Sequence, residues 1–173
     1  MQRLYGDNIM KTIWFCGNKE ETLTTIAEFV GEELINRDNY VELIVESEIR
    51  ELLGRGLKDT PEDKVTFTDR LGFLGNLLHR NGVFVLIISP NASVEDRKTV
   101  KKNYSNYLQI NIGDVKDLLC DLDLSLKDNP KENAKEIIEY LVFEKIIPEQ
   151  AQEVYSKEEE EEIRRRLEDL GYV

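Results

Sequence analysis

The sequence has few of the residues that cross-link small proteins. It contains only two cysteines and one histidine in 173 residues. Two cysteines far apart in the chain and a single histidine do not make a convincing zinc site or a disulfide framework. We therefore expect reduced thiols, with Cys16 at the end of a buried strand and Cys120 on a helix. Stability must then come from a hydrophobic core, and 40% hydrophobic residues suffice for one domain.

Long apolar runs and an excess of basic residues are also missing. No run approaches the ~20 apolar residues that cross a bilayer, and residues 1–7, M-Q-R-L-Y-G-D, lack the apolar part of a signal peptide. These absences predict a cytoplasmic protein without a membrane partner. The net charge of −12 argues against a nucleic-acid partner, because phosphate backbones require a basic surface.

Hydrophobic patterning predicts alternating strands and helices over the first 112 residues. Such alternation is typical of an α/β fold with a parallel sheet and helices on both faces. Ligands of these sheets bind at the carboxyl ends of the strands. The expected strands are 12–15, 40–45, 83–88 and 107–112, and the expected helices are 22–35, 47–53, 60–79 and one that begins at Ser93.

The chain becomes acidic and helical in pattern after residue 113. Residues 114–173 contain 18 acidic and 9 basic side chains. We expect helices at 115–122 and 130–145, and a tail helix that starts with a capping box at Ser156. This pattern divides the chain into an α/β domain, residues 1–125, and an acidic helical C-terminal extension, residues 126–173, that packs on the same domain.

Residues 12–25, T-I-W-F-C-G-N-K-E-E-T-L-T-T, have the spacing of a phosphate-binding P-loop between a strand and a helix. That loop, G-x-x-x-x-G-K-[ST], needs a second glycine so that backbone N–H groups can wrap the phosphates, and a lysine that holds them. Gly17 and Thr24 keep the first glycine and the hydroxyl that would bind a metal. Thr22 replaces the second glycine, and Leu23 replaces the lysine.

Two acidic residues, Glu20 and Glu21, add negative charge where a triphosphate would have to lie. Lys19 is the lysine within the loop, either as a substitute phosphate ligand or as a solvated side chain. The start of the helix could still bind one anionic group. The candidate remnant of the phosphate loop is Gly17, Lys19, Thr22, Thr24 and Thr25.

Three motifs resemble, in order and spacing, those of the adenylylsulfate kinase family. Residues 12–17, T-I-W-F-C-G, look like the family's T-I-W-F-T-G, residues 60–64, T-P-E-D-K, like S-x-x-D-R, and residues 88–90 like I-S-P. The family transfers the γ-phosphoryl group of ATP to the 3′-hydroxyl of adenosine 5′-phosphosulfate (APS) and forms PAPS. The resemblance covers about residues 11–112 and implies a P-loop kinase fold; the alternative is that the matches reflect a shared fold alone.

The same resemblance implies a binding side for APS or PAPS, and it also shows losses. Residues 45–50, V-E-S-E-I-R, stand where the family has D-G-D-N-[VI]-R, so Ser47 replaces the presumed base. Glu46 or Glu48 could substitute only if the backbone shifts. The family's basic lid, R-D-x-K-G-L-Y, has no counterpart after Asp114. The implied APS or PAPS residues are Arg50, Lys64, Arg70, Ser89 and Pro90, with Arg97 in place of a later arginine.

These departures leave three hypotheses. The favoured one is a catalytically impaired relative in sulfate activation that binds an adenine nucleotide such as APS or PAPS as a sensor or regulator. The second is an active, divergent adenylylsulfate kinase that uses ATP and Mg²⁺, with Lys19 on the phosphates and Thr24 on the metal. The third is a structural subunit that binds an ATP sulfurylase or a true APS kinase through its acidic tail. The resemblance further implies a homodimer.

Overall fold

The chain forms strands and helices in alternation. The computed structural model describes residues 12–90, 92–104, 106–114, 117, 119–149, 165, 166 and 168. The strands are β1 (Thr12–Cys16), β2 (Tyr40–Val45), β3 (Val83–Ile88), β4 (Tyr107–Ile112) and β5 (Leu122–Leu124). The helices are α1 (Glu20–Ile35), α2 (Glu46–Leu53), α3 (Pro61–His79), α4 (Val94–Asn103) and α5 (Pro130–Phe143).

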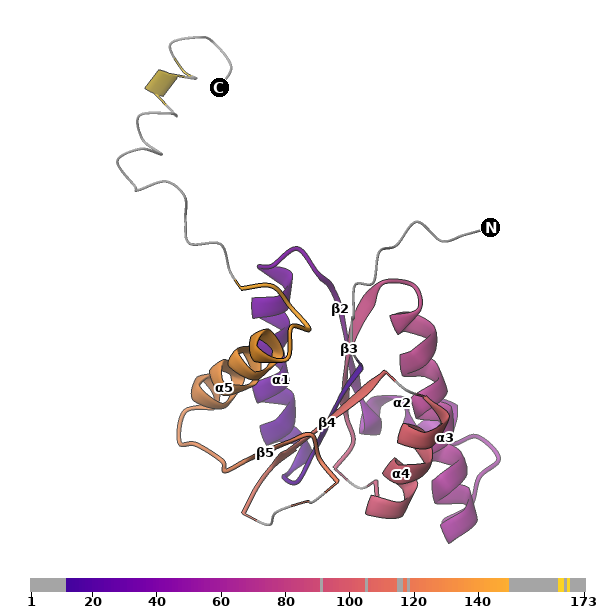
Figure 1. Cartoon of the computed structure of the whole chain (residues 1–173). Helices are drawn as coiled ribbons and strands as arrows, with labels where there is room; N and C mark the ends of the chain where they lie inside the picture. The colour runs from indigo at the N-terminus through magenta and orange to yellow at the C-terminus, as the bar shows by residue number, and fades with distance from the viewer. Residues whose placement is uncertain are drawn as a thin grey trace.

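The strands form one parallel sheet in the order β2-β3-β1-β4-β5. Helices α1 and α5 cover one face of the sheet, and α3 and α4 cover the other (Figure 1). β1 and β4 are buried along their whole length, as expected of central strands covered on both faces. The predicted fold class and the four predicted strands are thereby confirmed.

Local sequence signals explain where several helices begin. Thr60 caps α3 by accepting a hydrogen bond from the Asp63 amide, and Pro61 occupies the first helical position. Ser93 and Asp96 form a reciprocal capping box at the start of α4. The predicted starts at Thr60 and Ser93 are therefore confirmed.

The segment after β4 differs from the prediction. We expected a helix over residues 115–122 that carries Cys120, but among the described residues of this segment none is helical, and Leu122 begins β5. The backbone of Asp121 donates a hydrogen bond to the Gln109 carbonyl, and the Asp121 carboxylate accepts one from the Gln109 amide, both at 2.8 Å. These bonds align the alternating sequence L-D-L beside β4. The alternation, rather than a helical period, was the signal.

The C-terminal part is described only in part. α5 packs on α1, on the same face of the sheet (Figure 1). The predicted tail helix from Ser156 falls almost entirely outside the described residues. Within the part of the chain that the structure describes, no helix has both the length and the hydrophobicity to span a membrane.

Helix α3 approaches the sheet closely at Gly75. A Cβ atom there would lie 2.5 Å from Tyr107 Oη and 2.9 Å from Ile87 Cδ1. The Tyr107 ring is held in place, because its hydroxyl donates a buried hydrogen bond of 2.6 Å to the Gly72 carbonyl. Burial raises the pKa of Tyr107, so this hydroxyl stays protonated and remains a donor.

Gly75→Ala is therefore expected to lower the free energy of unfolding by about 1–3 kcal/mol, because the added methyl group overpacks the contact between α3 and the sheet. Gly31→Ala on α1 is the matched control. Its Cβ would meet Leu86 Cδ1 at 3.5 Å, an ordinary contact, and alanine favours a helix interior by roughly 0.5–1 kcal/mol. Urea unfolding compares the two variants, and equal stabilities would contradict the packing described.

Candidate functional site

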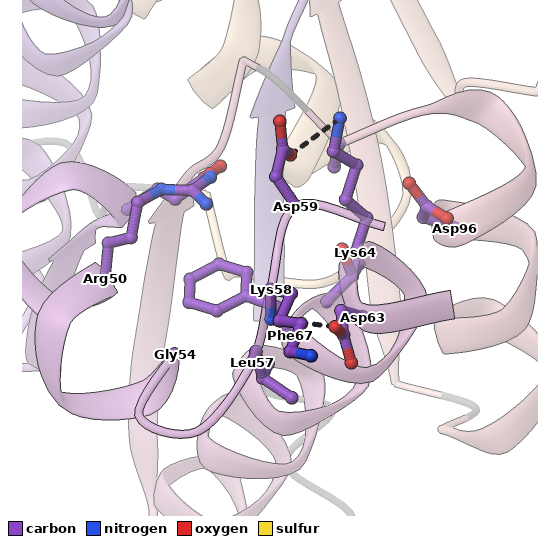
Figure 2. A pocket seen from close by; sticks show the side chains of 12 residues that line it. Arg50, Gly54, Leu57, Lys58, Asp59, Asp63, Lys64, Phe67 and Asp96 are labelled. Atoms are coloured by element: carbon purple, nitrogen blue, oxygen red, sulfur yellow. Dashed lines mark hydrogen bonds and ion pairs between the residues drawn. The ribbon is translucent and has the colours of Figure 1, made fainter. Parts of the chain in front are cut away.

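A cavity of about 580 Å³ lies at the carboxyl ends of β2 and β3. Its walls come from α2, α3, the loop between these helices and the start of α4 (Figure 2). This is the edge at which parallel sheets bind ligands. Among the predicted residues, Arg50 and Lys64 line the cavity.

A buried carboxylate, Glu46, forms the inner end of the cavity. Glu46 is only 2% exposed, and it accepts hydrogen bonds from the Ser89 hydroxyl and the Arg50 guanidinium. Arg50 also lies over the Phe67 ring, 4.6 Å from its centroid. Ser89 is itself buried at the end of β3, so it reaches the cavity through Glu46, and Pro90 follows it.

The start of α2 places Glu46 in the lining of the cavity. α2 begins at Glu46, directly after β2, so Glu46 and Arg50 are four residues apart on one face of the helix. Ser47 and Glu48, by contrast, are exposed. Of the two carboxylates that flank Ser47, it is therefore Glu46 that faces the cavity.

The outer part of the cavity carries charged side chains of both signs. Lys64 forms an ion pair of 3.0 Å with Asp59, in which both side chains are largely exposed (Figure 2). Asp63 accepts a hydrogen bond of 2.7 Å from the Lys58 amide, and Asp96 accepts one from the Ser93 amide. Among the described residues, no carboxylate forms an ion pair with the Lys58 ammonium group.

Two predicted arginines have other roles in the structure. The Arg70 guanidinium donates to the backbone carbonyls of Leu53 at 2.6 Å and Arg55 at 3.4 Å, and Arg70 is not among the lining residues. It thus holds the loop that follows α2. Arg97 is 4% exposed and forms an ion pair with Asp117, on the α4 face of β4.

The remnant of the phosphate loop is shorter than the sequence pattern implied. α1 begins at Glu20, two residues before the predicted start at Thr22, so only residues 17–19 connect β1 to the helix. Leu23, which takes the place of the P-loop lysine, is fully buried. The hydroxyl groups of Thr24 and Thr25 donate to the carbonyls of Glu20 and Glu21, at 2.8 and 3.0 Å.

The Glu20 carboxylate reaches from the start of α1 to the start of α2. It accepts hydrogen bonds from the Ser47 amide at 3.3 Å and from the Ser47 hydroxyl at 2.5 Å. A protein carboxylate thus takes the favourable place for an anion at the N-terminus of α2. Lys19, which precedes Glu20, is exposed and makes no capping bond.

The other side of the remnant is closed by β4. Gly17 has φ of +95°, and a Cβ atom there would lie 1.9 Å from Asn111 Oδ1. A Cβ atom at Gly113 would in turn lie 2.4 Å from the Gly17 carbonyl oxygen. Both positions require glycine, because the ends of β1 and β4 approach so closely.

Sequence reasoning missed Lys58, Leu57 and Asp59 as lining residues, and it missed the contact between Glu20 and Ser47. The three lining residues depend on the path of the loop after Gly54, for which the sequence carries no spacing signal. The contact of Glu20 had a weak signal, since two acidic residues are typical of the first turn of a helix.

Comparison with known proteins gives consistent results. Residues 10–116, more than half of the chain, match the family model described as adenylylsulphate kinase. The sequence is 34% identical over 100 residues to the adenylyl-sulfate kinase of Deinococcus deserti; the matched region covers 58% of this chain and 55% of that protein. It is 35% identical over 101 residues to a probable adenylyl-sulfate kinase of Synechocystis sp., with coverage of 57% and 56%. The chain thus spans about half the length of the curated relatives it matches.

Among solved structures, the APS kinase CysC of Mycobacterium tuberculosis, in complex with AMPPNP and APS, superposes with a TM-score of 0.65. The two sequences are 18% identical, and the superposition covers 76% of this chain and 96% of that one. At this identity the likeness establishes the fold. The predicted P-loop kinase fold is confirmed.

Arg50→Gln is expected to lower the free energy of unfolding by about 1–3 kcal/mol, because it leaves the Glu46 carboxylate buried without its cation. The Arg50 guanidinium is half-exposed, so this cost is below that of breaking a fully buried pair. The double variant Glu46→Gln/Arg50→Gln should recover part of the loss. Arg55→Gln, an exposed arginine outside the cavity lining, is the control. If chemical denaturation finds Arg50→Gln as stable as Arg55→Gln, the described contact between the buried Glu46 carboxylate and Arg50 is contradicted.

Proposed function

Because the chain belongs to the adenylylsulphate kinase family, we propose that it is a protein of sulfate activation that binds APS or PAPS without phosphorylating APS. The ligand would occupy the cavity lined by Arg50, Lys64 and Phe67. The observation that carries this proposal is the early start of α1 beside an intact cavity. The two halves of a kinase site, the part that would bind ATP and the cavity that would bind APS or PAPS, differ in this chain.

The first half, for ATP, lacks its phosphate cradle. A P-loop wraps phosphates with successive free backbone amides. In this chain the Leu23 amide donates a 3.0 Å hydrogen bond to the Lys19 carbonyl, as part of the first turn of α1. Leu23 is buried and uncharged, so it cannot replace the lysine that neutralises the β- and γ-phosphates.

ATP with Mg²⁺ also fits the charges of this region poorly. The Glu20 carboxylate lies at the N-terminus of α2 and would repel a triphosphate. The Thr24 hydroxyl, which would bind the metal, donates to a helix carbonyl. The exposed Lys19 is the remaining cation of the loop, and it lies directly beside Glu20.

The second half, the cavity, keeps the chemistry that an anionic nucleotide needs. Its volume of about 580 Å³ falls within the range of small-molecule sites. Phe67 and Leu57 supply apolar surface for a base, and Arg50, Lys58 and Lys64 supply positive charge. The exposed ion pair between Lys64 and Asp59 is weak, so a sulfate or phosphate group can replace the Asp59 carboxylate at small cost.

Isothermal titration calorimetry with APS and with PAPS tests this proposal. We expect saturable binding of at least one of the two nucleotides. For Lys64→Gln we expect a roughly tenfold higher Kd, because a charge-assisted hydrogen bond is lost. Lys102→Gln on α4 removes the same charge from an exposed position outside the cavity and should leave the Kd unchanged. The absence of binding of both nucleotides, or equal effects of the two variants, would contradict the assigned site.

A further inference from the structure

The two cysteines of the chain lie side by side, although 104 positions separate them. Their sulfur atoms are 3.7 Å apart, within hydrogen-bond reach for sulfur. Cys16, at the end of β1, is 3% exposed, whereas Cys120, in the segment before β5, is half-buried. They meet because β4 pairs with both β1 and β5. Both are free thiols, as the sequence predicted, but the sequence did not indicate that they are neighbours.

A fixed positive charge stands beside the two sulfur atoms. Arg97 Nη1 lies 3.5 Å from Cys120 Sγ and 3.1 Å from Gln109 Oε1. Arg97 Nη2 donates to the Asp117 carboxylate, and the whole side chain is 4% exposed. A buried guanidinium in this position stabilises negative charge on a neighbouring thiol.

The protonation of each thiol depends on that of the other. The pKa of Cys16 is lowered by its hydrogen bond with Cys120; desolvation opposes this effect, and the Arg97 charge supports it. The pKa of Cys120 is raised by the same hydrogen bond and by burial. The pair therefore loses its first proton as a unit, and the remaining proton lies between the sulfur atoms.

A metal site is the less favoured use of this cluster. The ligand atoms of Cys16, Asp117 and Cys120 lie within 4.8 Å of one another. The Asp117 carboxylate is already engaged by Arg97, however, and the guanidinium would repel a divalent cation at the same place. A thiolate beside a cation is instead typical of thiols that react with oxidants.

We propose that Cys16 and Cys120 form a dithiol that a peroxide oxidises reversibly to an intramolecular disulfide. The half-buried Cys120 meets the peroxide first: its proton passes across the hydrogen bond to the deprotonated Cys16 sulfur while the Cys120 sulfur attacks one peroxide oxygen. The O–O bond breaks, and hydroxide leaves as a sulfenic acid forms on Cys120. The Cys16 sulfur then attacks the Cys120 sulfur, the S–O bond breaks, and the hydroxide leaves with the Cys16 proton as water. Two thiols and one peroxide thus yield one disulfide and two waters.

The disulfide would tie the end of β1, next to Gly17, to the segment that leads into β5. It would thus cross-link β1 to this segment across β4. This inference does not depend on the proposed binding of APS or PAPS, because the cavity lining does not include Cys16, Cys120, Arg97 or Asp117.

Intact-mass measurement of the full chain after treatment with hydrogen peroxide tests the proposal. We expect the monomer to lose the mass of two hydrogen atoms, to resist alkylation by iodoacetamide, and to recover both thiols with dithiothreitol. Cys16→Ser and Cys120→Ser are matched controls. Since the chain has no third cysteine, each single variant should gain oxygen or an external thiol adduct instead.

Removal of the guanidinium charge tests the role of Arg97. Arg97→Gln should slow disulfide formation about tenfold at constant pH, and Arg97→Lys, which keeps the charge, should slow it less and serves if the glutamine variant fails to fold. An unchanged rate would overturn this role. Thiols that remain alkylatable after peroxide, a disulfide found only between chains, or a bound Zn²⁺ that protects both thiols would overturn the proposal itself.

Discussion

The backbone hydrogen bond from the Leu23 amide to the Lys19 carbonyl is the constraint on which the rest of the site depends. It starts α1 directly after residues 17–19, so the connection from β1 is shorter than the loop with which a P-loop wraps phosphates. With the helix in this position, Glu20 points to Ser47 and joins the start of α1 to the start of α2. The start of α1 is thus held by contacts within the protein.

The cavity depends on different elements and can therefore persist without the phosphate loop. Glu46 and Arg50 are set by the short helix that follows β2, and Lys64 and Phe67 by the capped start of α3. Arg70 fixes the loop between these helices through two backbone carbonyls. The cavity consequently does not depend on the residues that connect β1 to α1, and this independence is consistent with the proposed binding protein.

Sequence reasoning recovered the architecture where burial dictates the pattern. The run V-F-V-L-I-I fits a strand covered on both faces, and T-P-E-D carries the cap and proline of a helix start. It failed where two readings of the same residues compete. Glu20 and Glu21 repel phosphate in a loop but stabilise the first turn of a helix, and their pattern alone does not decide between the two. The alternating pattern of the three-residue strand β5 was too short to distinguish a strand from a helix.

The parts of the site that the sequence could not give depend on distant segments. Cys16 and Cys120 meet only because the sheet order places β4 between β1 and β5. Lys58 and Leu57 line the cavity only because of the path of one loop. Predictions of a homodimer, of an ATP sulfurylase partner and of the helical tail remain predictions.

The most direct test of the account is transfer of the labelled γ-phosphoryl group from ATP·Mg²⁺ to APS by the purified chain. The closed first turn of α1 predicts no PAPS and no ADP above the rate without protein. Formation of labelled PAPS that Lys19→Ala abolishes would contradict the account, because it would mean that a phosphate site still operates in the loop that α1 has shortened.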